Sequence, residues 1–180
     1  MINPQFVIFT GPMFGGKTSR MLSSLERAKY QKKKIVLFKP NGDNRYSTSK
    51  VKTHTGASWA ASLVSSGQDI LNEANGSDIV AVDEAFMIPG CAEALITLFK
   101  RGKTIYVSSL QLSAQGEPFE EMTKMFPWAT NIEVCPAVCP ISGQDAYYTI
   151  AKKEGLDTIH VGGAETYEPR SFYNSNIPLE

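Results

Sequence analysis

Residues 5–22 have the sequence QFVIFTGPMFGGKTSRML, in which an apolar run passes through a glycine-rich turn into an amphipathic segment. The run at 5–10 is apolar on both faces, which is typical of a central strand of a parallel sheet. Apolar residues then recur at helical spacing from Met21 to Ala28, and this predicts a helix over residues 17–32. A strand that leads through a tight turn into a helix indicates an α/β fold.

The same alternation continues along the chain. The expected strands are 34–39, 50–53, 79–82 and 104–109, and the expected helices are 68–74, 91–101 and 120–126. Strands that alternate with helices at this spacing indicate βαβ units and a parallel sheet flanked by helices. After about residue 131 the alternation fades into short β-like runs rich in prolines and aromatic residues. We therefore expect a main domain over residues 1–134 and a small C-terminal subdomain over residues 135–180.

Composition and charge exclude several classes of protein. The chain has 180 residues, which suits one compact domain with a small appendage. Eighteen Lys and Arg residues balance eighteen Asp and Glu residues, so the basic excess that sequence-neutral binding of nucleic acid requires is missing. We see no signal-peptide pattern and no apolar run near the ~20 residues of a membrane helix. Three cysteines cannot all pair with one another, which favours a reducing compartment. We expect a cytoplasmic protein without nucleic-acid or membrane partners.

The glycine-rich turn fits the phosphate-binding pattern G-x-x-x-x-G-K-S/T, and its position between a strand and a helix is the one that the motif requires. The candidate phosphate-binding residues are Gly11, Pro12, Met13, Phe14, Gly15, Gly16, Lys17 and Thr18. Glycines let backbone N–H groups close around phosphate oxygens, and the helix N-terminus adds a positive partial charge. We expect Lys17 to reach the β- and γ-phosphates and Thr18 to bind Mg²⁺. A chance Lys-Thr pair in an ordinary turn is the competing interpretation.

A second buried run, at 79–82, leads directly into Asp83 and Glu84. Ligands of open α/β sheets bind at the C-terminal ends of the strands, so both carboxylates are expected beside the phosphate loop. Asp83 is a candidate Mg²⁺ ligand, and Glu84 is a candidate base for the proton of a nucleophile. The alternative, in which the two acids only cap the next turn, is weaker beside a phosphate loop. The two motifs predict a nucleoside-triphosphate site without choosing between ATPase, GTPase and kinase.

Several segments resemble the type II thymidine kinases, the cellular and bacterial type. The loop GPMFGGKT at 11–18 resembles that family's GPMFSGKS or GPMFSGKT, in which Met and Phe are not generic phosphate-loop residues. The other matching segments, in family order, are KPNGDNRYS at 39–47, THTG at 53–56, DEA at 83–85, GEPF at 116–119 and VGGAETYE at 161–168. The resemblance therefore covers nearly the whole chain.

The resemblance implies a RecA-like P-loop kinase domain at 1–134 and a lasso at 135–180 that closes over the nucleoside. It implies transfer of the ATP γ-phosphoryl group to the 5′-hydroxyl of thymidine, and also of deoxyuridine, with Mg²⁺. Glu84 then matches the catalytic base and acts with Lys17, and Arg45 matches an arginine near the transferred phosphate. The implied nucleoside-binding residues are Met13, Leu110, Phe119, Thr149, Ile159, Val161, Gly162 and Tyr167. A homo-oligomer, commonly a tetramer, and feedback inhibition by thymidine triphosphate are implied as well.

Some of these residues have a plainer interpretation. Arg45 could be a solvated loop charge, and Leu110 and Phe119 could be ordinary core residues. Tyr167 is the stronger candidate because the Gly162-Gly163 pair before it indicates a close approach of the backbone.

The chain departs from the family at the lasso, where most members hold a structural zinc ion on four cysteines. The corresponding residues here are Cys139, Ser142, Ser171 and Asn174, and serine and asparagine are poor zinc ligands. An improvised site of Cys139 with Cys135 and His160 would still lack four good ligands, so we expect no zinc. The lasso must then be ordered by its aromatic residues, by subunit contacts or by the nucleoside.

The chain also departs from the family near the expected nucleoside pocket. The loop from Gln111 to Gln115 is rebuilt, with Ala114 where an aromatic residue often packs, and Phe86 and Met87 replace the family's Gln and Phe. A kinase of another deoxynucleoside is therefore an alternative. A P-loop ATPase or nucleotide-binding module without nucleoside chemistry is a second alternative, and a DNA-handling ATPase is the least favoured.

Overall fold

The computed structural model of the chain describes residues 3–42, 50–52, 58–153, 155, 157–159 and 161–175. Its centre is a six-stranded sheet in the order β5-β2-β6-β7-β1-β8, in which every neighbouring pair is parallel. The strands are β1 (Phe6–Thr10), β2 (Ile35–Pro40), β5 (Ser62–Val64), β6 (Ile79–Asp83), β7 (Thr104–Ser109) and β8 (Asn131–Val134). The expected parallel α/β sheet is confirmed. β7 separates the strand that enters the phosphate loop from the strand that ends in Asp83, which matches the RecA-like arrangement.

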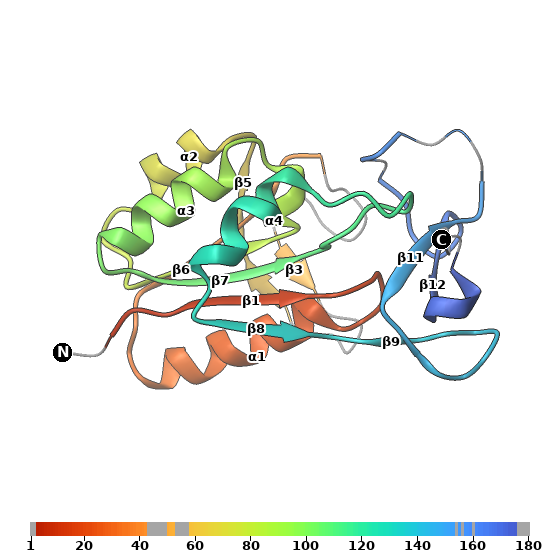
Figure 1. Cartoon of the computed structure of the whole chain (residues 1–180). Coiled ribbons are helices and arrows are strands. Elements are labelled where there is room, and N and C mark those ends of the chain that lie inside the picture. The colour runs from red at the N-terminus through yellow and green to blue at the C-terminus, as the bar shows by residue number, and fades with distance from the viewer. Residues whose placement is uncertain are drawn as a thin grey trace.

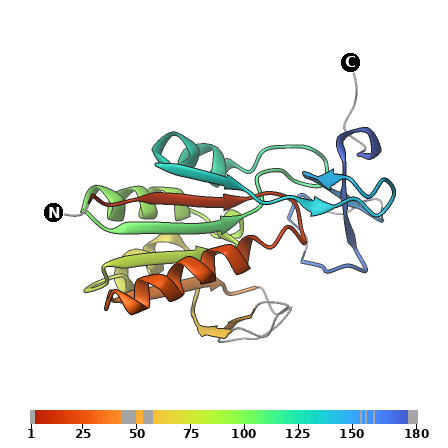
Figure 2. The same cartoon turned by 90° about the horizontal axis from the view of Figure 1, so that it is seen from below.

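Helices cover both faces of this sheet (Figure 1). The helix α1 (Lys17–Tyr30) lies on one face, and α2 (Gly67–Glu73), α3 (Cys91–Lys100) and α4 (Glu120–Met125) lie on the other. Figure 2 shows the same layers from below, with α1 running along the sheet. The described residues also form three single-turn 3₁₀ helices: η1 (Ala85–Met87), η2 (Phe126–Trp128) and η3 (Phe172–Asn174).

The alternation of side chains along β1 divides the core between these two layers. Phe6 and Ile8 belong to the cluster formed with α2, α3 and α4, whereas Val7 and Phe9 belong to the cluster formed with α1. All four side chains are at most 6% exposed. A strand that is buried on both faces carries no polar alternation, which explains why the apolar run before the phosphate loop is continuous.

A short hairpin of β3 (Lys50–Lys52) and β4 (Ser58–Ala60) packs on the α1 side of the molecule. Val51 and Trp59 join the cluster under α1, and the Lys29 ammonium lies 5.5 Å from the centroid of the Trp59 ring. The hairpin therefore extends the core beyond the sheet.

Beyond β8, the described part of the chain forms two small antiparallel sheets at one end of the molecule (Figure 1). They are made of β9 (Ala137–Val138) with β10 (Asp145–Ala146), and of β11 (Tyr148–Ala151) with β12 (Tyr167–Arg170). Both lie beyond the C-terminal ends of the central strands, the end at which the sequence places the site.

The strands and helices that the sequence predicts begin within one or two residues of their expected positions. The expected strand at 50–53, however, does not join the parallel sheet: β3 pairs with β4 in an antiparallel hairpin, and β5 forms the edge of the sheet instead. One boundary differs: the expected strand ends at residue 39, whereas β2 also includes Pro40 as its last residue. The pairing of β2 with β6 ends at Phe38, so the missing N–H of Pro40 removes no bond on that side. The three-residue strands β4 and β5 are too short for periodicity to reveal. Within the described residues, no helix has the length and apolarity needed to cross a membrane.

Candidate active site

The phosphate loop joins β1 to α1 and requires glycine at several positions. Gly11 and Gly16 have φ angles of 134° and 77°, a backbone conformation that residues with a Cβ rarely adopt. At Gly11 and Gly15 an added Cβ would overlap the main-chain oxygen of Cys135, the residue directly after β8. The Cys135 amide donates a 2.7 Å hydrogen bond to the carbonyl of Thr10. The continuation of β8 therefore supports the back of the loop and leaves no room there for side chains.

Lys17 is the first residue of α1, and its side chain is folded over the loop. The residue is only 7% exposed, and its ammonium donates a 2.5 Å hydrogen bond to the carbonyl of Pro12. A buried ammonium held against the backbone of the phosphate loop is positioned to meet phosphate oxygens.

Thr18 and Asp83 come together from α1 and β6. The Thr18 hydroxyl donates a 2.9 Å hydrogen bond to the Asp83 carboxylate, and it lies 3.4 Å from the Ser108 hydroxyl of β7. These groups are hard oxygen donors, which suit Mg²⁺. Within the described residues, no group of three or more His, Cys, Asp or Glu side chains offers another metal site. The structure thus places both predicted Mg²⁺ residues at one point of the sheet edge.

Glu84 follows β6 in a conformation that is unusual for glutamate. Its φ of 53° and ψ of 44° are left-handed, and such a conformation costs a non-glycine residue on the order of 1–3 kcal/mol. The turn is fixed on its far side, because the Met87 amide bonds the Glu84 carbonyl at 3.0 Å and the Phe86 amide bonds the Ser109 hydroxyl at 3.1 Å. Such strain is characteristic of functional positions.

A cavity adjoins the phosphate loop on the side of the C-terminal sheets. Seven of the eight predicted nucleoside-binding residues line it, namely Met13, Leu110, Phe119, Thr149, Val161, Gly162 and Tyr167. The eighth, Ile159, is 47% exposed and lies outside the lining. The Met13 amide donates a 2.9 Å hydrogen bond to the Thr149 hydroxyl of β11, so the phosphate loop and the cavity are physically joined.

Sequence reasoning missed part of this lining. The additional residues are Phe86, Met87, Leu112, Ser113, Ala114 and Thr158. The Phe86 ring packs against the Phe119 ring with centroids 4.4 Å apart and an interplanar angle of 36°. A signal existed for Phe86, Met87 and Ala114, because these residues depart from the family pattern. Arg45 and His160 lie outside the described residues.

Burial settles the chemistry of the cysteine behind the phosphate loop. Cys135 is 2% exposed, and burial, with the nearby Glu133 carboxylate, raises the pKa of its thiol. The thiol is therefore neutral near pH 7, and a neutral thiol is a poor nucleophile.

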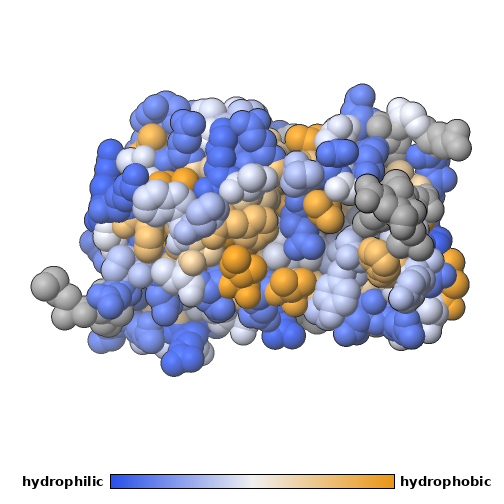
Figure 3. All heavy atoms as spheres, viewed as in Figure 1, coloured by the Kyte–Doolittle hydropathy of each residue, from blue (hydrophilic) through white to orange (hydrophobic). Residues whose placement is uncertain are grey.

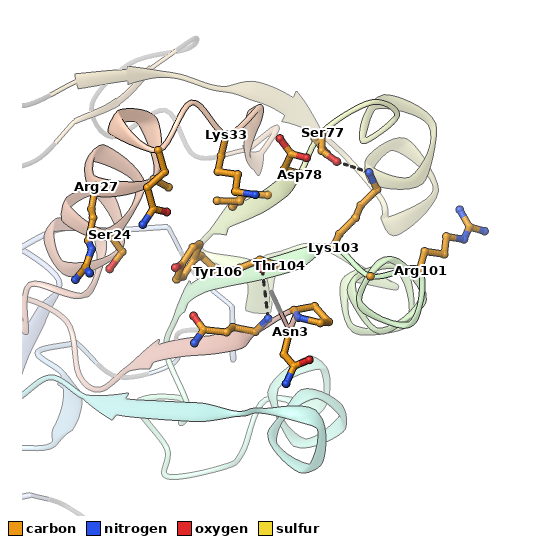
Figure 4. A pocket seen from close by; sticks show the side chains of 16 residues that line it. Asn3, Ser24, Arg27, Lys33, Ser77, Asp78, Arg101, Lys103, Thr104 and Tyr106 are labelled. Atoms are coloured by element: carbon orange, nitrogen blue, oxygen red, sulfur yellow. Dashed lines mark hydrogen bonds between the residues drawn. The ribbon is translucent and has the colours of Figure 1, made fainter. Parts of the chain in front are cut away.

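A larger cavity of about 600 Å³ lies at the opposite ends of the strands (Figure 4). Its lining includes Ile79 and Thr104, the first residues of β6 and β7. Polar groups there bond one another: the Lys103 ammonium donates to the Ser77 carbonyl at 2.5 Å. None of the predicted catalytic or binding residues lines it, so its size does not make it the candidate site.

Comparison with known proteins agrees with this geometry. The thymidine kinase family model matches residues 5–172. The thymidine kinase of Thermococcus kodakarensis is 34% identical over 188 residues, which cover 96% of this chain and 94% of that protein. The thymidine kinase of Coprothermobacter proteolyticus is 34% identical over 178 residues (95% and 90%), and that of Pyrobaculum aerophilum is 31% identical over 182 residues (96% and 98%).

Among solved structures, the genome packaging NTPase B204 of Sulfolobus turreted icosahedral virus 2, in complex with ATP-gammaS, matches with a TM-score of 0.48 and 15% identity, over 78% of this chain and 79% of that chain. The family model spans both the phosphate loop and the cavity wall at Tyr167. The chain belongs to the thymidine kinase family.

Proposed function

We propose that this protein transfers the γ-phosphoryl group of ATP to the 5′-hydroxyl of thymidine, and also of deoxyuridine, for pyrimidine salvage. The observation that carries the proposal is that Met13 belongs to two parts of the site. This residue belongs to the phosphate loop, and it also lines the cavity in which the nucleoside would bind. A nucleoside bound there would have its 5′-hydroxyl close to the terminal phosphate of a nucleotide held by the loop.

The residues at the sheet edge supply what phosphoryl transfer needs, which is mainly alignment and neutralisation of charge. Lys17 would contact the β- and γ-phosphates, and Thr18 and Asp83 would hold Mg²⁺. The metal ion, when bound, would neutralise developing charge on the phosphate oxygens. Arg45 remains a predicted contact of the transferred group.

Glu84 is the proposed general base. It follows Asp83 directly, and its left-handed backbone starts the turn that places Phe86 and Met87 in the cavity wall. Because Glu84 stands in the chain between the metal residue Asp83 and the cavity residue Phe86, its carboxylate is the candidate to accept the proton of the 5′-hydroxyl. We also propose that residues 135–180 act as a subdomain that closes over the nucleoside.

The decisive experiment is turnover of ATP with Mg²⁺, alone and with each of the four natural deoxynucleosides, with products identified by mass. We expect thymidine monophosphate from thymidine only. Glu84→Gln should lower kcat about 10²–10⁴-fold, whereas Glu73→Gln, which changes an exposed glutamate at the end of α2, should leave kcat unchanged. A rate of ATP hydrolysis that is the same with and without each of the four nucleosides would favour the ATPase alternative.

Phosphorylation of another deoxynucleoside is the second candidate function. The observation that favours it is that Phe86 and Ala114, two departures from the family pattern, both line the cavity. The same experiment separates the two candidates, because the mass of the product identifies the base.

We further infer a cytoplasmic homo-oligomer, most simply a tetramer, that is inhibited by thymidine triphosphate and needs no structural zinc. Support for association comes from β8, an edge strand of the sheet. Figure 3 shows apolar side chains gathered over this strand, where Ile132 and Val134 are 44% and 46% exposed. An exposed apolar edge strand is a surface on which chains associate. Light scattering of the purified protein tests the number of subunits.

A further inference from the structure

Two turns of the C-terminal part meet through their side chains. One turn joins β9 to β10 and contains Cys139 and Ser142, and the other follows β12 and contains Ser171 and Asn174. The Ser142 and Ser171 hydroxyls lie 3.2 Å apart, and the Asn174 amide group donates a 3.0 Å hydrogen bond to the Ser171 hydroxyl. The contact between the two hydroxyls joins residues 29 positions apart in the chain, whereas the Asn174 bond lies within the second turn.

Each turn is also closed internally. The main-chain amide of Gly143 donates a 2.8 Å hydrogen bond to the Cys139 carbonyl, and the main-chain amide of Asn174 donates a 3.0 Å hydrogen bond to the Ser171 carbonyl. The Ser142 hydroxyl in addition accepts from the Gln144 amide at 3.4 Å. The two turns therefore present preformed polar surfaces to one another.

Cys139 lies at the centre of this contact. It is 0% exposed and packs with Ala137 and Ala146. Burial by itself raises the pKa of the thiol, but hydrogen bonds from the side chains and backbones of Ser142 and Ser171 outweigh burial and lower the pKa to about 6. Hydrogen bonds from both turns to the Cys139 sulfur therefore connect the two turns.

We propose that Cys139, Ser142, Ser171 and Asn174 form a hydrogen-bonded clamp, without metal, that positions the wall of the nucleoside cavity. The clamp holds the end of β12, which pairs with β11 in the register Thr149↔Pro169 and Ala151↔Tyr167.

β11 carries the Thr149 hydroxyl that bonds the Met13 amide, and β12 begins with Tyr167 in the cavity wall. Loosening the clamp therefore frees the cavity wall, whereas the phosphate loop keeps its supports from β8 and α1. These four residues are positioning residues, since none of them lines the cavity.

The test compares Cys139→Ala and Ser171→Ala with matched controls. Cys91→Ala removes another fully buried thiol, in α3, and Ser77→Ala removes a serine whose hydroxyl bonds the Ala74 carbonyl at 2.7 Å. The first readout is hydrogen exchange of the β11 and β12 amides, which needs no substrate. We expect about tenfold faster exchange in the two clamp variants, as loss of one buried hydrogen bond implies, and unchanged exchange in the controls.

The second readout is the KM for thymidine, and this one rests on the proposed function. The clamp variants should raise it about tenfold while the KM for ATP stays within about twofold. Unchanged exchange of β11 and β12 in both clamp variants would overturn the proposal whatever the substrate is. Loosening of the wild-type strands by EDTA would also overturn it, because the clamp would then depend on metal. If Cys139→Ala fails to fold, Ser171→Ala and Asn174→Ala decide by the same readouts.

Discussion

The main-chain amide of Met13 donates a 2.9 Å hydrogen bond to the hydroxyl of Thr149, a residue 136 positions later in the chain. One end of this bond is in the phosphate loop and the other is in β11, at the wall of the cavity. The bond is buried, so neither group can turn to water instead. The Thr149 side chain therefore fixes the distance between two parts of the site. One is the loop that would hold the nucleotide, and the other is the strand that would contact the nucleoside.

Replacement of Thr149 by valine tests this link. Valine keeps the shape but removes the acceptor, so the Met13 N–H stays buried without its partner at a cost of about 1–3 kcal/mol. Thr149→Ser keeps the hydroxyl and is the matched control. We expect urea unfolding to show the loss in the valine variant only, together with a raised KM for both ATP and thymidine. Equal stability of the two variants would show that the bond contributes nothing.

The glycine requirement of the phosphate loop can be separated from backbone strain at Gly15. Gly15 is not among the residues with positive φ, yet an added Cβ would overlap the Cys135 carbonyl oxygen. Gly15→Ala should therefore push the loop off β8 and weaken ATP binding at least tenfold, because backbone must move to accept the methyl group. Gly42→Ala is the control, since nothing lies within 4 Å of the Cβ there. ATP titration by calorimetry measures both variants.

Local sequence signals account for what could be predicted. The phosphate loop, the acids after β6 and the buried strands each depend on neighbouring residues, so the motif and the apolar runs locate them. Ile159 shows the limit: the family resemblance implies that it contacts the nucleoside, but Thr158 lines the cavity and Ile159 does not. The ring contact between Phe86 and Phe119 joins residues far apart in sequence, and no periodicity encodes it.

The polar contact of the two C-terminal turns was also beyond sequence reasoning. From the missing cysteines we expect aromatic packing, subunit contacts or nucleoside to order this part of the chain. One such contact is present, since the Tyr148 and Phe172 rings lie 5.9 Å apart. The hydroxyls of Ser142 and Ser171, which read as poor metal ligands, instead bond each other. That serine is a poor zinc ligand therefore says nothing about whether its hydroxyl forms a hydrogen bond in the fold.

The cavity lining yields a prediction about Phe86 and Ala114. Adding a ring by Ala114→Phe should overfill a cavity that already holds the Phe86 and Phe119 rings, at a cost of about 1–3 kcal/mol. Thymidine KM should rise, and the double variant with Phe86→Gln should recover it, because the second change removes a ring from the same space. The thymidine KM of both single variants and of the double variant, compared with the wild type, gives the coupling between the two substitutions. Additive effects would mean that the two residues do not share the space.

The Cys139 thiol makes the stability of the C-terminal turns depend on pH. Hydrogen bonds from Ser142 and Ser171 lower its pKa from 9.0 to about 6 despite burial, so the folded state favours the thiolate. This contribution is fully present above about pH 9 and is lost as pH falls through about 6. The causes of the shift include no charged group, although β10 carries Asp145 and β12 carries Glu168 and Arg170.

We therefore expect protection of the β11 and β12 amides, corrected for the intrinsic rate of exchange, to increase from pH 6 to pH 9 in the wild type. Cys139→Ser should abolish that increase, since its hydroxyl stays neutral throughout. The comparison between the two proteins cancels the titration of Cys91 and Cys135, whose pKa values are raised by burial. Parallel pH profiles for the two proteins would contradict the assignment of the thiolate.

The convergence of the two turns also predicts a gain of function. Hydrogen bonds already bring Ser142, Ser171 and Asn174 around the buried Cys139. The triple variant Ser142→Cys, Ser171→Cys and Asn174→Cys would complete four thiol ligands, which is a set that suits tetrahedral zinc. We expect the variant to bind one zinc ion per chain, and EDTA to speed exchange of its β11 and β12 amides, whereas the wild type binds none and ignores EDTA. Metal content by mass spectrometry decides the matter: a triple variant that folds yet retains no zinc would show that the four positions do not converge as the hydrogen bonds indicate.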